Sequence, residues 1–207
     1  MKRTLSLISI VSTIFLTSQA NAKDGLYAGV DLVLSKAKYK YVNEGAAQTN
    51  PQSKIDGNGV GVGASIGYKK SFNQVFVAPE VFYDYLNSST KDYYHTQIPY
   101  QQDTLELRSR YGAKVNVGHD FTEKFSAYVT GGLANVDQIT NSPSLKDSRG
   151  KTRTSAIYGL GAIFNLNDNW AIRAEFNTQR FNATYYDPNV VSKTRLNVLK
   201  TGLVYSF

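Results

Sequence analysis

The chain has 207 residues, enough for one domain with a sizeable core. The absence of cysteine excludes disulfide scaffolds, cysteine-ligated zinc and thiol nucleophiles. Charged residues make up 19% and aromatic residues 13%, with fifteen tyrosines, a mixture too aromatic for a disordered chain and poor in charge for a soluble surface.

The first 22 residues have the pattern of an export signal. Two basic residues at positions 2–3 precede an apolar stretch, 5–16, and residues 20–22 form a small-x-small cleavage site. A buried N-terminal helix is the alternative and fits this pattern less well. We expect cleavage after Ala22 and a mature barrel domain of residues 23–207. Loss of the two basic residues lowers the net charge from +7 to +5, which does not favour a nucleic-acid partner.

Period-2 alternation of apolar and polar residues recurs through the rest of the chain, whereas no run of eighteen apolar residues occurs there. Each alternating segment is long enough for the about 9–11 residues that a tilted membrane-crossing strand needs. In chain order, the predicted strands are 26–35, 59–68, 75–85, 105–118, 125–136, 155–166, 170–181 and 195–207.

The connections between these strands alternate in length. Short ones lie near 69–74, 119–124 and 166–169, and long ones near 37–56, 87–103, 137–153 and 182–193. This order places both termini and all short turns at one end. The sequence therefore predicts an all-β fold, an eight-stranded antiparallel up-and-down transmembrane β-barrel with short periplasmic turns and four long extracellular loops.

Alternation alone does not decide between a lipocalin-like soluble barrel and a barrel with its apolar face toward lipid. Glycines and full charges share the polar face, and aromatic residues on the apolar face gather near strand ends, which favours lipid outside. The predicted interior charge network consists of Asp31, Glu80, Asp84, Glu106, Arg108, Arg110, Lys114, Arg173, Glu175 and Lys200.

The strand directions suggest which of these charges meet. We expect Lys200 to approach Asp31 and Glu175, because the last strand closes the barrel between their strands. Lys114 should approach Glu80, and Arg110 should approach Asp84. Leu105 and Leu107 are expected on the lipid face. Pro79 lies within a strand and lacks an N–H group, so we expect a bulge or a local break in pairing there.

Two stretches carry a family resemblance. Lys200, Gly202, Tyr205 and Phe207 match the polar-x-Gly-x-x-aromatic-x-aromatic terminus by which bacterial outer-membrane barrels resemble one another. Residues 159–176 are similar to the sixth strand, tight turn and seventh strand of small OmpA/OmpX-like barrels.

The resemblance implies insertion into the bacterial outer membrane by the barrel-assembly machinery, with the four terminal residues as its recognition signal. Lipid and lipopolysaccharide would surround such a barrel. The Lys-, Asn- and Tyr-rich composition is also similar to that of surface barrels of intracellular alphaproteobacteria such as rickettsiae, some of which are adhesins.

Candidate catalytic groups are few. His95 lies in a predicted loop near two aspartates, and a solvated loop histidine is the simpler interpretation. The glycines at 57, 59, 61 and 63 resemble a phosphate loop, but no helix follows them. No carboxylate cluster has metal-ligand spacing. We expect no enzymatic activity, no cofactor and no metal.

The functional expectation is a surface protein with a plugged barrel, because eight strands leave room only for side chains inside. Its loops would mediate adhesion or contact host-cell surface proteins, since tyrosine gives large contact area at low entropic cost. A purely structural barrel and a narrow ion-conducting porin are the alternatives. The candidate loop contacts are Tyr93, Tyr94, Tyr100, Arg149, Lys151, Arg153, Tyr185 and Tyr186.

Overall fold

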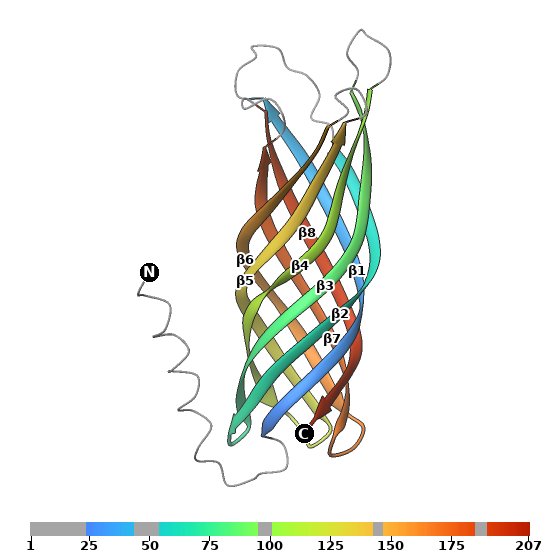
Figure 1. Cartoon of the computed structure of the whole chain (residues 1–207). Helices are drawn as coiled ribbons and strands as arrows, with labels where there is room; N and C mark the ends of the chain where they lie inside the picture. The colour runs from blue at the N-terminus through green and yellow to red at the C-terminus, as the bar shows by residue number, and fades with distance from the viewer. Residues whose placement is uncertain (1–23, 44–53, 95–100, 143–146, 185–189) are drawn as a thin grey trace, which may run out of the picture.

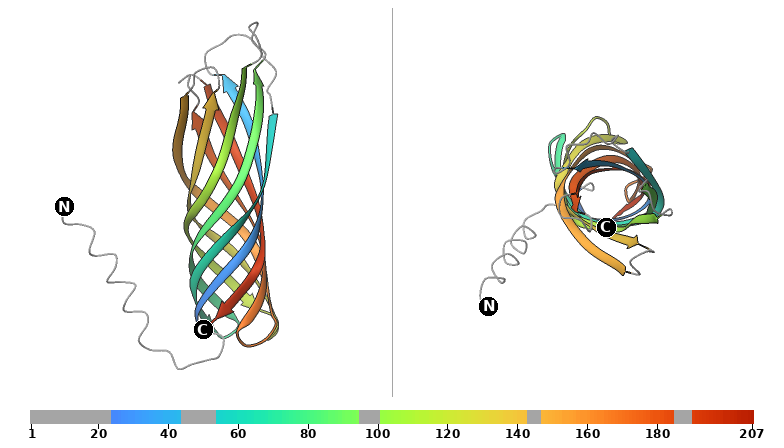
Figure 2. Two further views of the ribbon diagram at one scale, coloured as in Figure 1. Left: turned by 45° about the vertical axis from the view of Figure 1, so that its right-hand side comes forward. Right: turned by 90° about the horizontal axis from the view of Figure 1, so that it is seen from above.

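Eight antiparallel strands close into one barrel in which each strand pairs with its neighbours in the sequence and β1 pairs with β8 (Figure 1). The strands are tilted around the barrel, and a view along the axis shows the closed ring (Figure 2). The chain enters β1 and leaves β8 at the same end as the short turns. The predicted up-and-down topology is confirmed.

The strands in order are β1 (Gly25–Asn43), β2 (Lys54–Phe72), β3 (Val75–Tyr94), β4 (Gln101–Asp120), β5 (Phe125–Ser142), β6 (Asp147–Asn165), β7 (Trp170–Thr184) and β8 (Val190–Ser206). The computed structural model describes the backbone of residues 24–43, 54–94, 101–142, 147–184 and 190–207, and the side chains of 24–38, 56–89, 106–139, 150–182 and 193–207. The predicted signal peptide lies outside these residues. The described residues contain no helix long and apolar enough to cross a membrane.

The strands extend well into the segments predicted as long loops. β3 and β4 remain paired as far as Tyr94 and Gln101, and β5 and β6 as far as Ser142 and Asp147. These outer strand ends are polar on both faces, so no apolar alternation marks them in the sequence. Backbone pairing with the neighbouring strand holds them instead.

The alternating faces separate an apolar exterior from a closed interior. Along β1, Leu26, Val30, Leu32 and Leu34 are exposed, while the alternating residues Tyr27, Gly29, Asp31 and Val33 are buried. The exterior carries aromatic residues at two levels, with Tyr83 and Tyr111 stacked at the upper one. At the lower level, near the short turns, lie Phe72, Phe121, Phe125, Phe164, Trp170 and Phe207. Two aromatic girdles around an apolar band are typical of a barrel in a membrane.

A bulge in β4 overturns part of the predicted alternation. The register with β5 shifts between Leu107 and Ser109, and Ser109 and Arg110 are both buried. Above this point the faces of β4 exchange, because a one-residue slip moves every side chain to the other face. The prediction that Glu106 and Arg108 lie in the interior network is therefore wrong.

The two residues pair with each other outside that network, where Arg108 Nε lies 3.5 Å from the Glu106 carboxylate and Arg108 is 59% exposed. Leu107, predicted to face lipid, is fully buried in the interior.

The expected break in pairing at Pro79 is confirmed. β2 and β3 keep the same register on both sides of Pro79, but Pro79 and Ala78 have no partner on β2. The flanking pairs are Glu80 with Gly67 and Val77 with Lys70. On its other side Pro79 pairs with Val115 of β4. The interruption is confined to one edge of β3, which accommodates the missing N–H without opening the barrel.

Gly61 provides a stability prediction. A Cβ atom there would overlap the carbonyl oxygen of Tyr85 on β3. Gly61→Ala is expected to lower the free energy of unfolding by about 1–3 kcal/mol through this overlap. Urea unfolding in lipid vesicles, followed by the fluorescence of the single tryptophan, measures the change.

Gly131→Ala is the matched control, because a Cβ there meets nothing within 4 Å. It should change the free energy of unfolding by less than about 0.5 kcal/mol. Equal stability of the two variants would contradict the close approach of β3 to Gly61.

Candidate functional site in the barrel interior and at its outer rim

Eight buried charges form one alternating circuit across the middle of the barrel. Each acid is joined to a base by an ion pair of 2.5–3.2 Å, and each member is no more than 4% exposed. In order of contact, the circuit runs Glu175, Lys114, Glu80, Arg173, Asp31, Lys200, Asp84 and Arg110. We call this set the central network. Four acids and four bases leave it without net charge.

Asn177 closes the circuit. Its amide oxygen accepts a hydrogen bond from Arg110 Nη1 at 2.6 Å, and its amide nitrogen donates to the Glu175 carboxylate at 2.9 Å. Arg110 Nε and Nη2 both donate to Asp84 Oδ2, at 3.1 and 2.6 Å. Buried charges need hydrogen bonds and counter-charges of this kind, because an unpaired charge in the interior is costly.

Most of the expected pairings occur, and one differs. Lys200 contacts Asp31 at 3.2 Å, Lys114 contacts Glu80 at 3.2 Å, and Arg110 contacts Asp84. Lys200 and Glu175 are partners in the β7–β8 register, but the Glu175 carboxylate turns to Lys114 on β4. The lumen is narrow enough for side chains to meet across it, and strand adjacency does not reveal such contacts.

Three aromatic residues of the interior were not among the predicted site residues. Tyr27 and Tyr128 donate hydrogen bonds to Glu80 and Glu175, at 2.8 and 2.7 Å. Phe82 lies at the centre of the cations, with its ring 5.2–5.6 Å from Arg110, Lys114 and Lys200. The period-2 alternation places each of these residues on the inward face of its strand, and this pattern could have identified them.

Apolar layers lie on both sides of the central network. Toward the turns, Tyr27, Phe76, Ala78, Tyr128, Ala171 and Val204 pack together. Toward the outer rim lies the second layer, Val33, Ala37, Leu86, Leu107, Val136, Phe181, Leu196 and Val198, here called the outer apolar layer. The interior therefore contains apolar layers in addition to the charges and glycines that were predicted there.

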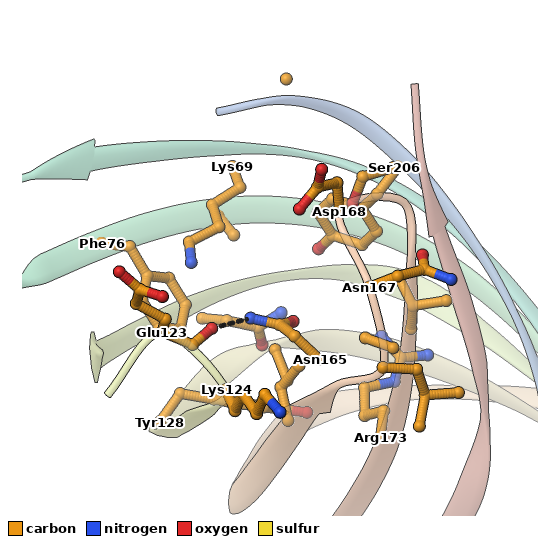
Figure 3. A pocket seen from close by; sticks show the side chains of 18 residues that line it. Lys69, Phe76, Glu123, Lys124, Tyr128, Asn165, Asn167, Asp168, Arg173 and Ser206 are labelled. Atoms are coloured by element: carbon orange, nitrogen blue, oxygen red, sulfur yellow. Dashed lines mark hydrogen bonds between the residues drawn. The ribbon is translucent and has the colours of Figure 1, made fainter. Parts of the chain in front are cut away.

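A cavity of about 230 Å³ opens at the turn end of the barrel (Figure 3). Phe76 and Tyr128 line its wall and Arg173 its inner end, while Lys69 and Lys124 lie near its mouth. Asn165 donates a hydrogen bond of 2.8 Å to the Glu123 carbonyl between two turns. The cavity ends at the central network.

The predicted assembly residues divide between the two faces. Lys200 belongs to the central network, and a Cβ at Gly202 would lie 2.0 Å from the Val30 carbonyl oxygen. Tyr205 packs edge-on against both Trp170 and Phe207, at 5.0 and 5.1 Å between ring centres. Phe207 is exposed beside the short turns. Recognition by assembly machinery stays a prediction.

The candidate loop contacts that the structure describes lie at the outer end of the barrel. Tyr93 and Tyr94 are the last two residues of β3, and Arg149 lies near the start of β6. Lys151 is exposed and Arg153 is half-buried. The other candidates, Tyr100, Tyr185 and Tyr186, and also His95, lie outside the described residues. Among the described residues, no cluster of His, Cys, Asp and Glu is suited to a metal.

Comparisons with known proteins extend over nearly the whole chain. The model of the outer membrane protein beta-barrel domain family matches residues 6–207. No curated protein matches the sequence.

Among solved structures, OprG from Pseudomonas aeruginosa is similar with a TM-score of 0.59 and 11% identity over 89% of this chain and 97% of that one. Neisserial surface protein A is similar with a TM-score of 0.50 and 15% identity over 92% of this chain and 100% of that one. For the Yersinia pestis attachment invasion locus protein Ail, the TM-score is 0.46 and the identity 16%, over 88% of this chain and 99% of that one. The apolar exterior, the aromatic girdles and the closed topology agree with the family match. The chain therefore belongs to the outer-membrane β-barrel family and is a multi-pass protein of the bacterial outer membrane.

Proposed function

We propose that this protein is a plugged barrel whose outer rim and loops bind partners at the cell surface, acting as an adhesin. The observation that carries the proposal is the combination of a filled interior with strands that continue above the lipid-facing band. At about 3.3 Å per residue and a tilt of about 40°, β3 rises roughly 20 Å between Tyr85 and Tyr94. That length carries the end of β3 clear of the lipid head groups.

The chemistry of the rim supports recognition. Tyrosines at 93 and 94 end β3, and cations at 149, 151 and 153 follow the third loop. Aromatic rings with few rotatable bonds bind at low entropic cost, and cations suit sugars or proteins that carry negative charge. Host-cell surface molecules are the partner class we infer.

A purely structural barrel would need the same interior but no particular rim chemistry. A narrow ion-conducting porin would need a continuous path, against which the outer apolar layer and the central network both count. An enzyme would need a nucleophile and a base in contact, and the interior acids are all committed to cations. Adhesion is therefore the function that we favour.

Loop replacement tests the adhesin proposal. Bacteria that display the protein should bind cultured host cells, and replacing residues 95–100 and 185–189 with Gly/Ser linkers should reduce binding at least about tenfold. The same replacement at the turn 121–124, on the other end of the barrel, is the control and should leave binding intact. Unchanged adhesion after the loop replacement would remove these loops from the proposal.

A further inference from the structure

Three cations lie side by side on the outer wall of the barrel. Arg180 of β7 is the register partner of Arg195 on β8, and Arg195 is the partner of Lys38 on β1. All three are exposed and lie on the outward face of their strands. We call them the cation row. The row crosses the seam where the last strand closes onto the first.

The cation row has a fixed height above the apolar band. A second row lies four residues closer to the short turns on each of the three strands. It consists of Phe176, Leu199 and Leu34, which are also register partners and are exposed apolar residues. Between the two rows lie the neutral residues Thr178 and Asn197, and on β1 Lys36, whose charge is paired with Asp56. At about 3.3 Å per residue and a tilt of about 40°, the cations lie roughly 10 Å above the last apolar row.

Direct juxtaposition of like charges across strands is destabilising unless an anion intervenes. Within the described part of the chain, none of the three cations forms an ion pair. The nearest carboxylate in the row is that of Asp56, the partner of Lys38 in the register, and it pairs with Lys36 Nζ at 3.2 Å. Three positive charges therefore remain available to an external ligand.

A groove of about 730 Å³ lies directly below the cation row. Its lower wall is apolar, with Leu34, Phe176 and Leu199, and its upper wall carries Lys36 and Asn58. On the opposite side of the barrel, the exposed Arg108 is paired with Glu106.

The vertical order of apolar groove, neutral amides and cations matches an amphiphile with acyl chains, sugar hydroxyls and phosphates. Guanidinium groups bind phosphate oxygens through two parallel hydrogen bonds, which suits the two arginines. We propose that Arg180, Arg195 and Lys38 bind the phosphates of one lipopolysaccharide molecule whose acyl chains begin in the groove. This site lies on the barrel wall and is independent of the loops assigned to adhesion.

Binding of purified lipopolysaccharide to the protein in phosphatidylcholine nanodiscs tests the proposal. The triple variant Lys38→Gln/Arg180→Gln/Arg195→Gln should bind at least about tenfold more weakly than the wild type. The control Lys70→Gln/Arg108→Gln/Lys124→Gln removes the same charge from surface positions elsewhere and should bind like the wild type. An equal loss in both variants would overturn the site, because it would indicate attraction by overall charge.

Two further arms use the wild-type protein and so do not depend on variant folding. Dephosphorylated lipopolysaccharide, with its sugars and acyl chains intact, should bind at least about tenfold more weakly. Phosphatidylglycerol added to the nanodiscs should not displace lipopolysaccharide from the protein. Undiminished binding of the dephosphorylated form would overturn the role of the phosphates, and full competition by phosphatidylglycerol would overturn the glycolipid as the ligand.

Discussion

Replacing Lys114 with methionine is expected to lower the free energy of unfolding by about 3–5 kcal/mol, the cost of leaving a buried charge without its partner. Lys114 Nζ contacts Glu175 at 2.5 Å and Glu80 at 3.2 Å. Glu80 keeps the Arg173 guanidinium at 2.7 Å, but the only ion pair of Glu175 among the described residues is the one with Lys114. Glu175 is therefore the carboxylate that loses its counter-charge.

A second substitution distinguishes charge from packing. In Lys114→Met/Glu175→Gln the orphaned charge is removed as well, while Tyr128 and Asn177 retain an amide as hydrogen-bond partner. We expect this double variant to recover most of the stability lost in Lys114→Met, because replacing both members of a buried pair is often nearly neutral. Urea unfolding in lipid vesicles, monitored through Trp170, gives both values.

Arg108→Met provides the control on the same strand. Arg108 is also paired with a glutamate, yet it is 59% exposed, and exposed ion pairs contribute about 0–1 kcal/mol. The control should therefore be close to the wild type in stability. Equal losses in Arg108→Met and Lys114→Met would contradict the assignment of Lys114 to a buried network and of Arg108 to the exterior.

The strand pattern was predictable because lipid imposes it. Every second residue of β1 from Leu26 to Leu34 faces outward, so its apolar character depends on the membrane and not on any particular neighbour. The outer strand ends have no such constraint, since both faces there are polar. Their extent follows from backbone pairing, as between Ser142 and Asp147, and a period-2 search does not detect it.

Errors at Glu106, Leu107 and Arg108 have a different origin. The alternation in this stretch is unbroken in the sequence, but the ladder with β5 slips by one residue at the bulge and exchanges the two faces. A bulge is decided by the partner strands, here also by the register shift of β3 between Tyr85 and Ser88. Nothing local to β4 marks the position.

The central network was predictable in membership and less so in pairing. Eight of the ten proposed charges lie in it, because charged residues on the inward face of a narrow barrel have nowhere else to lie. The contact of Lys114 with Glu175 spans the lumen between β4 and β7. Its existence depends on the barrel diameter and on side-chain reach, which strand order alone does not supply.

The wild-type protein in planar lipid bilayers is expected to show no large, stable single-channel openings. Two barriers lie in series along the axis. The central network fills the middle with paired charges, and Leu86, Leu107 and Leu196 of the outer apolar layer are fully buried above it. An apolar constriction excludes ions by remaining dry, independently of the charges below it.

Removing one barrier should therefore leave the barrel closed, because ion flow through barriers in series is limited by the higher one. Leu86→Ala/Leu196→Ala widens the outer apolar layer, and Asp84→Ala/Arg110→Ala takes one balanced pair from the central network. We expect neither double variant to conduct and the combined quadruple variant to open, with heat-modifiable electrophoretic mobility as the check on folding. Large, stable openings in the wild type would refute the plugged barrel outright, and conduction after the leucine substitutions alone would show that the central network is permeable to ions.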